Sequence, residues 1–399
     1  MRAVHVISEL CVGGVATMLS DLLPALLKRG IDVSLWHFGT GGNVRPDTIA
    51  SRCPTLDLGH RRELLHRRVR RLIERFNQSG ADIIHLHDLS VDVVLAALIS
   101  DARTIAHVHE APTRKIFHVP LYTRLGIVRR AFRPMTLRRF DAIMTCSNSS
   151  EEFALRAYGI PRDRLHVIRN GVDVQRIRME ARSEEETRGR SRDSVRFGYL
   201  GRLDSIKNLP LLLSACDRMK KDSCDWSLSI IGDGPLRFAL EGRVSEAALS
   251  DRITFVGEVS NPVAHLNQID VLVHPSDSEG MSISMLEAMS LGIPIVAVEV
   301  GGNAECMVDG QTGLLVPPGD EKAFTDACRR LGCDDELRVQ MGRNGRRRVM
   351  AEFAIERVAT EIAACYAQLM DQPPTVKVSP REDKLRAEPS PAGVGRITR

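Results

Sequence analysis

The sequence predicts an α/β protein in which two Rossmann-like domains face each other across a cleft. Apolar strand-like runs alternate with helical patterns along most of the 399 residues, which is typical of parallel sheets with crossover helices. The alternation stops in the charged stretch 175–194 and restarts at Val195 with the same order of strand, loop and helix as at the N-terminus. We therefore expect one domain at 1–174, a linker at 175–194 that could contain a short helix, and a second domain at 195–354.

The individual elements follow from apolar runs bounded by glycine, proline or polar residues. The strands are expected at 3–8, 32–38, 83–86, 104–107, 142–146, 195–200, 227–231, 253–256, 271–274 and 293–298. The helices are expected at 16–28, 209–220, 283–290, 322–331, 335–352 and 355–369. The last of these is expected to pack back on the first domain as a helix at about 355–370. The tail at 372–399 is rich in proline, serine and charge, and we expect it to be disordered.

Composition narrows the class of protein. The formal charge of +4 indicates no polyanionic partner, and 17 aromatic residues (2 Trp, 4 Tyr and 11 Phe) with no recognisable binding motif argue against a nucleic-acid binder. Nine cysteines without a C-x-x-C pair argue against a disulfide framework and against a zinc site. This cysteine usage predicts a reducing cytoplasm. The N-terminus resembles a first strand rather than a signal peptide. No run of about 18 apolar residues occurs, so we expect no membrane-spanning segment.

The stretch 274–297, HPSDSEGMSISMLEAMSLGIPIVA, organises the chain. It predicts a strand end, a loop that turns at Gly280, and a helix with Ser282 as its N-cap. Such a helix start offers unpaired N–H groups and partial positive charge to an anion. Glu279 lies in the loop and Glu287 lies eight residues later, inside the helix. Both carboxylates could accept hydrogen bonds from the hydroxyls of one bound molecule, although an arbitrary pair at this spacing is more often a capping residue and a solvated one.

This stretch closely resembles the E-x7-E signature of the GT4-like family of retaining glycosyltransferases, which have the GT-B fold. The resemblance implies that Glu279 holds hydroxyls of the donor sugar and Glu287 holds the ribose, with the amides near Met281–Ile283 on the diphosphate. Met281 and Ser282 stand where Phe and Gly are commoner, beside the sugar. GGNAE at 301–305, DGQTGLLVPPGD at 309–320 and NGVD at 170–173 extend the resemblance to most of residues 1–370.

Four further segments are candidates for donor binding. GRL-x-x-x-KN places Arg202 and Lys207 at the carboxyl end of a strand, where ligands of such sheets bind. By resemblance, these two cations stabilise the departing nucleoside diphosphate, and Gly14 belongs to a glycine-rich loop that approaches the phosphates. Gly232 and Asp233 of GDGP, and Val256, resemble the segments that line the base.

His107 and His109 follow an apolar strand on the same side of it, and one of them is expected to be a core histidine. His109 resembles the family's histidine that meets the donor sugar from the N-terminal domain, whereas the adjacent Glu110 departs from the family pattern. Asp88, after His85 and His87, is a lesser candidate for the acceptor pocket. H-x-H pairs also suggest metal ligands, but no third ligand follows at motif spacing and there is no D-x-D, so we expect neither metal nor cofactor. The absence of G-x-G-x-x-G argues against an NAD enzyme.

The predicted function is transfer of a sugar from a UDP- or GDP-linked donor to a hydroxyl of a glycan, glycolipid or small molecule. The expected mechanism is retaining and metal-independent, with His109, Arg202, Lys207 and Glu279 in the catalytic roles. The alternative is a catalytically inactive partner subunit of the same fold, which the intact Glu279, Glu287, Arg202 and Lys207 disfavour.

Two basic segments, 61–75 with seven arginines and 114–139 with no Asp or Glu, raise the possibility of an anionic membrane surface. In the second segment Leu121, Leu125, Val128 and Phe132 repeat at helical spacing. A helix that packs its apolar stripe on its own domain is the commoner explanation of such a repeat. The protein is then expected either in the cytoplasm or at the inner face of the membrane.

Overall fold

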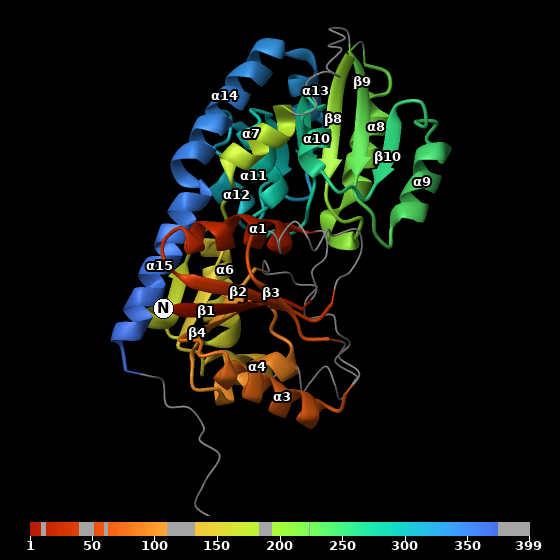
Figure 1. Cartoon of the computed structure of the whole chain (residues 1–399). Helices are drawn as coiled ribbons and strands as arrows, with labels where there is room; N and C mark the ends of the chain where they lie inside the picture. The colour runs from red at the N-terminus through yellow and green to blue at the C-terminus, as the bar shows by residue number, and fades with distance from the viewer. Residues whose placement is uncertain are drawn as a thin grey trace, which may run out of the picture.

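A computed structural model describes residues 1–8, 13–39, 52–59, 63–109, 132–182, 194–222 and 224–373. Within these residues the chain forms two parallel sheets, each flanked by helices (Figure 1). The strand order is β3-β2-β1-β4-β5-β6-β7 in the first sheet and β10-β9-β8-β11-β12-β13 in the second. In both sheets the order reverses beside the first strand, at β1/β4 and at β8/β11, which are the switch points where ligands of open α/β sheets bind.

The first sheet is built within residues 2–167. Its strands are β1 (Arg2–Val6), β2 (Asp32–His37), β3 (Thr55–Asp57), β4 (Ile83–Leu86), β5 (Arg103–Val108), β6 (Ala142–Thr145) and β7 (Leu165–Val167), and its helices are α1 (Gly14–Leu27), α3 (Leu65–Gln78), α4 (Val91–Ile99) and α6 (Asn148–Tyr158). Alternate residues of each strand enter different cores. Ile83 packs with α1 and α15, whereas Ile84 packs with α3 and α4, as expected of a sheet covered on both faces.

The second sheet follows α7 (Val174–Arg182). Its strands are β8 (Ser194–Leu200), β9 (Asp225–Ile231), β10 (Ile253–Gly257), β11 (Val271–His274), β12 (Ile295–Val298) and β13 (Gly313–Val316). Its helices are α8 (Leu209–Met219), α9 (Arg237–Glu246), α10 (Pro262–Leu266), α11 (Ile283–Ser290), α12 (Asn303–Cys306), α13 (Glu321–Cys333) and α14 (Asp335–Glu352). Every strand pair in this sheet is parallel.

The chain returns to the first domain through α15 (Ile355–Asp371), which continues from α14 and packs against α1 (Figure 1). Val172 is bonded on both sides of this return: its amide donates to Phe353 O (3.0 Å), and its carbonyl accepts from the Ile355 amide (3.0 Å). One hydrophobic core includes side chains of α1, α7, α11 and α15, so apolar packing joins the two domains.

Most sequence-predicted elements are confirmed to within two residues at each end. The segments 83–86, 271–274, 283–290 and 335–352 have the expected bounds. Helices α3, α4, α6, α9 and α10 were not assigned from the sequence. The predictions for Glu110, for the helical repeat from Leu121 to Val128, for most of the linker and for the tail beyond 373 lie outside the described residues.

One expectation about the cysteines was wrong. Cys224 and Cys333 form a disulfide that joins the start of β9 to the end of α13. The two residues are 109 positions apart, so no local sequence pattern could predict that they pair. Six other described cysteines are free and buried. Across the described part of the chain, no helix combines the length and the apolar character needed to cross a membrane.

The close packing at the return of the chain gives a first prediction. A Cβ on Gly171 would lie 2.6 Å from Val358 Cγ2 and 2.9 Å from Phe353 O, so Gly171→Ala forces α15 away from the first domain. We expect a loss of about 1–3 kcal/mol in the free energy of unfolding, measured by denaturant titration. Gly242→Ala is the matched control, because a Cβ there meets nothing within 4 Å and alanine favours the helix. Equal effects of the two substitutions would contradict the described packing.

Candidate active site

A buried charged cluster lies at the switch point of the second sheet. Lys207 Nζ donates to Glu279 Oε1 at 2.5 Å, and His274 Nε2 lies 2.9 Å from the same oxygen. Glu279 and His274 are both buried, and the Lys207 side chain is 23% exposed. The cluster therefore has one cationic end that a ligand can reach.

Local structure holds each member of this cluster. His274 ends the buried strand β11, and Ser276 Oγ lies 3.3 Å from its Nε2. Lys207 ends a short 3₁₀ turn (Ser205–Lys207), and the Asp204 carboxylate caps that turn by accepting from the amides of Ile206 (3.0 Å) and Lys207 (3.3 Å). The backbone of Lys207 is thus fixed by its own loop, and its side chain extends from there to Glu279.

Two glycines let the loop that carries Glu279 pack closely. The Gly302 amide donates to Glu279 O at 3.1 Å. A Cβ on Gly301 would overlap Glu279 O, and a Cβ on Gly302 would overlap Gly280 O. Gly301 also has a φ of +49°, which favours glycine. The GGNAE segment therefore acts as a backbone support for the glutamate.

The charges around Glu279 keep its carboxylate ionised. Burial alone would raise the pKa of Glu279, but the ammonium of Lys207 and the contact with His274 together hold that pKa well below its usual value. Removing Glu279 would leave Lys207 without its buried partner. Glu279→Ala therefore disturbs the fold more than a substitution that keeps the shape of the side chain.

The start of α11 lies directly after this loop. Ser282 occupies the N-cap position, as expected, but its hydroxyl makes no cap hydrogen bond and instead lies 2.9 Å from Ser284 Oγ. The predicted side-chain cap is therefore wrong, because a second hydroxyl competes for Ser282. The uncapped amides at the start of this eight-residue helix stay available to an anion.

Glu287 has different neighbours from Glu279. It is buried inside α11, and its Oε1 lies 3.9 Å from Arg176 Nη2 of α7. Arg176 is held in turn by Asp21 of α1, with its Nε 2.7 Å from Asp21 Oδ1. Burial raises the pKa of Glu287 to about 7, although Arg176 opposes the rise. Among the described residues the two glutamates share no ion-pair partner. The ribose assignment for Glu287 stays a prediction.

Residues of the first domain contact this region. A Cβ on Gly280 would overlap His109 O, so the loop after β5 touches the loop after β11. Asn170 Nδ2 donates to Met281 O at 3.0 Å. A Cβ on Gly14, at the start of α1, would lie 3.4 Å from Ile283 Cγ1. Gly14, His109, Met281, Ser282 and Ile283 are therefore brought together with Glu279.

The remaining predicted residues have other neighbours. The Arg202 side chain is 72% exposed and is paired with Asp204 at 2.7 Å, so its role as a fixed cation stays a prediction. Gly232 has a φ of +127° and packs against Gly201 O. The carboxylate of Asp233 accepts hydrogen bonds from the Gly234 amide and from Arg237. Val256 lies where the register of the β9/β10 pair shifts. Asp88 accepts from the amide and the hydroxyl of Ser90.

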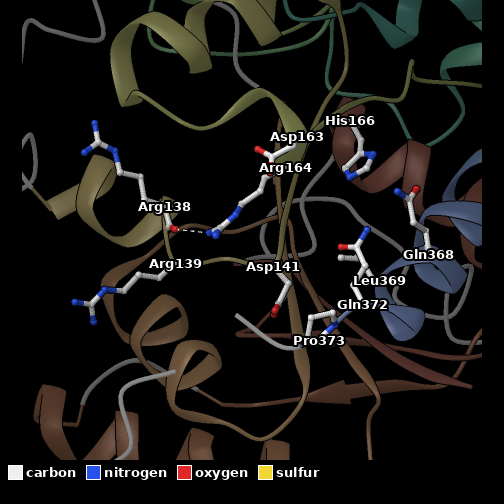
Figure 2. Close-up of a pocket in the computed structure, with 10 residues that line it drawn as sticks. All are labelled: Arg138, Arg139, Asp141, Asp163, Arg164, His166, Gln368, Leu369, Gln372 and Pro373. Atoms are coloured by element: carbon white, nitrogen blue, oxygen red, sulfur yellow. Dashed lines mark hydrogen bonds between the residues drawn. The ribbon is translucent and has the colours of Figure 1, made fainter. Parts of the chain in front are cut away.

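A separate cavity of about 750 Å³ lies at the β6–β7 edge of the first sheet, beside the end of α15 (Figure 2). Its polar groups are largely committed to the fold. Arg164 donates to Arg138 O, Arg138 donates to Tyr158 O, and Asp141 accepts from Thr104. We therefore place the candidate active site at the junction of the domains.

Sequence reasoning missed the partners that define the cluster. His274 was assigned only as a strand end, and Asp204 was not singled out, although a polar residue closing an apolar run and an acid three residues before a lysine are visible signals. Asp21 and Arg176 could not be paired from the sequence, because they are 155 residues apart.

Comparison with known proteins identifies the family of the chain. Residues 182–348 match the family model for glycosyl transferases group 1, and residues 12–176 match the model for glycosyltransferase family 4. The lipopolysaccharide core biosynthesis mannosyltransferase LpcC of Rhizobium leguminosarum is 30% identical over 67% of this chain and 74% of its own length. Its counterpart LpsB of Rhizobium meliloti is 32% identical over 59% of this chain and 67% of its own length.

Solved structures show the fold. HepE of Anabaena, in complex with UDP and glucose, superposes with a TM-score of 0.77 at 17% identity and covers 92% of this chain and 99% of its own. WaaG, a glycosyltransferase involved in lipopolysaccharide biosynthesis, superposes with a TM-score of 0.71 at 13% identity and covers 90% of this chain and 99% of its own. The fold is the two-domain GT-B fold, and the protein is a glycosyltransferase. It belongs to the GT4-like family of group 1 glycosyltransferases.

The raised pKa of Glu287 predicts how stability changes with pH. Glu287 titrates near 4.5 in the unfolded chain and near 7 in the native protein. Between these values the unfolded chain has released a proton that the native protein keeps, so the free energy of unfolding falls as pH rises, by up to about 3 kcal/mol. Glu287→Gln should remove this part of the fall, measured as melting temperature at pH 5 and pH 7. Glu361→Gln, at an exposed helix position, is the control and should leave the pH dependence as in the parent protein.

Proposed function

We propose that this glycosyltransferase moves a hexosyl group from a nucleoside-diphosphate sugar to an acceptor hydroxyl, with retention of anomeric configuration and without a metal ion. The observation that carries the proposal is the Lys207–Glu279–His274 cluster beside the uncapped start of α11. It combines a reachable cation, an ionised carboxylate and free amides, which are the groups that a diphosphate and a sugar require.

Each group has a distinct part in this proposal. A diphosphate beside Lys207 takes the ammonium as its counter-ion. The amides near Met281–Ile283 and the long side chain of Arg202 stabilise the diphosphate further. The carboxylate of Glu279 is then left to accept from hydroxyls of the donor sugar. His109 meets the sugar from the first domain, and Glu287 is assigned to the ribose.

Retention follows from attack on the face that the leaving group occupies. A leaving-group oxygen takes the acceptor proton, so no enzymic nucleophile is needed and the cations carry the developing charge. The two relatives named as lipopolysaccharide core mannosyltransferases support a mannosyl donor and a lipid-linked glycan acceptor. The UDP and glucose of HepE support the wider class of nucleotide-sugar donor.

A lipid-linked acceptor would place the protein at the inner face of a membrane. Helix α3 carries five arginines on a strongly amphipathic sequence, LHRRVRRLIERFNQ. Leu64 is 62% exposed and Leu65 is 45% exposed at the start of this helix. Arginines around two exposed leucines are the composition of a surface that rests on anionic lipid.

Glu279→Gln tests the assignment of the carboxylate. The amide keeps the shape and a contact with Lys207 but loses the charge, so we expect kcat/KM to fall at least about a hundredfold. The measurement is transfer from GDP-mannose and UDP-glucose to a lipid-linked glycan. Glu361→Gln is the control. Near-normal turnover of Glu279→Gln would contradict the proposal, and an absence of transfer by the parent protein with any donor would favour the inactive-subunit alternative.

The membrane surface is tested separately with liposomes of neutral lipid and of mixed neutral and anionic lipid. We expect co-sedimentation that rises with anionic lipid and falls with salt, and that the double substitution Leu64→Ser/Leu65→Ser weakens it about tenfold. Val339→Ser is the matched control, since Val339 is 52% exposed on α14 of the other domain. Binding that does not depend on anionic lipid would remove the proposed surface.

A further inference from the structure

Five histidines gather at the carboxyl ends of β1, β4 and β5, next to the candidate active site: His5, His85, His87, His107 and His109. They share the face of the sheet that packs against α15, because they continue the alternate positions occupied by Ala3, Ile83 and Ile105. The hydroxyl of Tyr366, on α15, contacts His5 and His85 of this group. Isolated core histidines are common, but five in mutual contact need a separate explanation.

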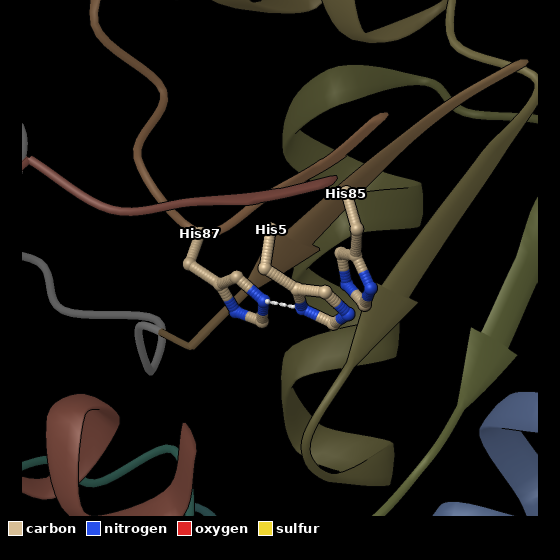
Figure 3. Close-up of side chains that lie close together, drawn as sticks. All are labelled: His5, His85 and His87. Carbon is tan, nitrogen blue, oxygen red and sulfur yellow. Dashed lines mark hydrogen bonds between the residues drawn. The ribbon is translucent and has the colours of Figure 1, made fainter. Parts of the chain in front are cut away.

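Three of these rings form a hydrogen-bonded row that starts at Tyr366. Tyr366 Oη lies 3.1 Å from His5 Nε2, and His5 Nδ1 lies 3.0 Å from His87 Nε2 (Figure 3). His87 Nδ1 lies 2.8 Å from His109 Nε2. The row therefore connects the hydroxyl of α15 to His109 by three consecutive hydrogen bonds.

The rings of the row lie edge to edge rather than face to face. The centroids of His5 and His87 are 5.3 Å apart with an interplanar angle of 14°, and those of His87 and His109 are 5.1 Å apart with an angle of 21°. This geometry suits N–H···N bonds. His107 instead stacks on His109, with centroids 4.0 Å apart, and His85 stacks on His87 at 4.4 Å.

The row consists of neutral imidazoles. Burial lowers the pKa of His5 to about 3 and that of His109 to about 4, and burial with the neighbouring histidines lowers the pKa of His87 well below its usual value. Each neutral ring has one N–H and one bare nitrogen, so every ring must donate on one side and accept on the other. The direction of the first hydrogen bond therefore sets the tautomer of every ring in the row.

Tyr366 sets that direction, because its single hydroxyl hydrogen has two possible acceptors. Its oxygen also lies 2.7 Å from His85 Nδ1, and His85 Nε2 is buried with no partner among the described residues. If Tyr366 donated to His85 Nδ1, the single ring hydrogen of His85 would be bonded to Nε2. That N–H would be buried without an acceptor among the described residues. If Tyr366 donates to His5, His85 Nδ1–H donates to Tyr366 and only a bare lone pair is left unpaired. Buried N–H groups without acceptors are the rarer and costlier case, so donation to His5 is favoured.

We propose that Tyr366, His5 and His87 are positioning residues that fix His109 as the neutral Nδ1–H tautomer, so that His109 offers a hydrogen-bond donor to the donor sugar. Donation runs from Tyr366 to His5 Nε2, from His5 Nδ1 to His87 Nε2, and from His87 Nδ1 to His109 Nε2. The hydrogen of His109 is thereby left on Nδ1. The role of His109 toward the sugar rests on the proposed function, whereas its tautomer is a property of the free protein.

A metal centre is the competing use of these histidines. Ring nitrogens of His5, His85 and His87 all lie within 4.8 Å of one another, and so do those of His87, His107 and His109. Tetrahedral zinc at about 2.0–2.1 Å from each nitrogen would hold two nitrogens roughly 3.4 Å apart with both lone pairs aimed at the ion. The bonded pairs are closer, at 3.0 and 2.8 Å, and each places a lone pair against the neighbour's N–H. The hydrogen-bonded row accounts for this spacing and the metal does not.

The proposal is tested on the full chain labelled with ¹⁵N-histidine. Nitrogen spectra distinguish the Nδ1–H from the Nε2–H tautomer, and His109→Gln assigns the resonance of His109. We expect a single Nδ1–H tautomer in the parent protein and a mixture in Tyr366→Phe, which keeps the ring and removes the hydroxyl. His5→Phe, which interrupts the row one step later, should give the same mixture. Tyr158→Phe is the matched control, since Tyr158 is buried on α6 away from the row.

Kinetics provide the second readout. Tyr366→Phe should lower kcat about tenfold, as expected for loss of one well-placed hydrogen-bond donor, with KM for the donor changed less than about twofold. An unchanged tautomer in both Tyr366→Phe and His5→Phe would overturn the proposal, as would stoichiometric Zn²⁺ binding that shifts these five resonances. If the parent protein shows the tautomer but transfers no sugar, the proposed function fails and the tautomer relay stands.

Discussion

The partly buried ion pair between Lys207 and Glu279 is the constraint around which the second domain is arranged. A carboxylate and an ammonium taken out of water lose several kcal/mol of hydration each, and their attraction seldom does more than offset that loss. Asp204 holds the lysine loop, His274 adds a second contact to Glu279, and Gly301 and Gly302 support the glutamate backbone. So much local structure around one pair is better explained by a ligand that needs both charges than by stability.

The position of the pair follows from topology. β8 and β11 are neighbours at the point where the strand order reverses, so the loops that carry Lys207 and Glu279 open side by side at the carboxyl edge of the sheet. The first sheet has the same order, and its switch point lies between β1 and β4, which carry His5 and His87. The core shared by α1, α7, α11 and α15 holds the two edges against each other and brings His109 to Gly280. Each half of the site thus lies at the point where the strand order of its sheet reverses.

The sequence was informative wherever a pattern is local. Apolar runs bounded by glycine, proline or polar residues predicted the strand at 271–274 and the helix at 283–290 with the bounds that the structure has. Ser282 was placed at the N-cap but not bonded correctly, because Ser284 offers its hydroxyl an alternative partner. Contacts between distant positions could not be predicted: Lys207 with Glu279, Asp21 with Arg176, Cys224 with Cys333 and Tyr366 with His5. Each joins residues at least 72 positions apart, and only the fold decides which of them meet.

The most direct measurement of the central claim is calorimetric binding of UDP, GDP and ADP to the parent protein and to Lys207→Gln. Lys220→Gln is the control, because Lys220 is an exposed lysine at the end of α8. The account predicts that one of the three nucleotides binds the parent protein, and that Lys207→Gln weakens this binding at least about tenfold by removing the counter-ion of the diphosphate. Binding of equal strength to both proteins, or no binding of any nucleoside diphosphate to the parent, would contradict it.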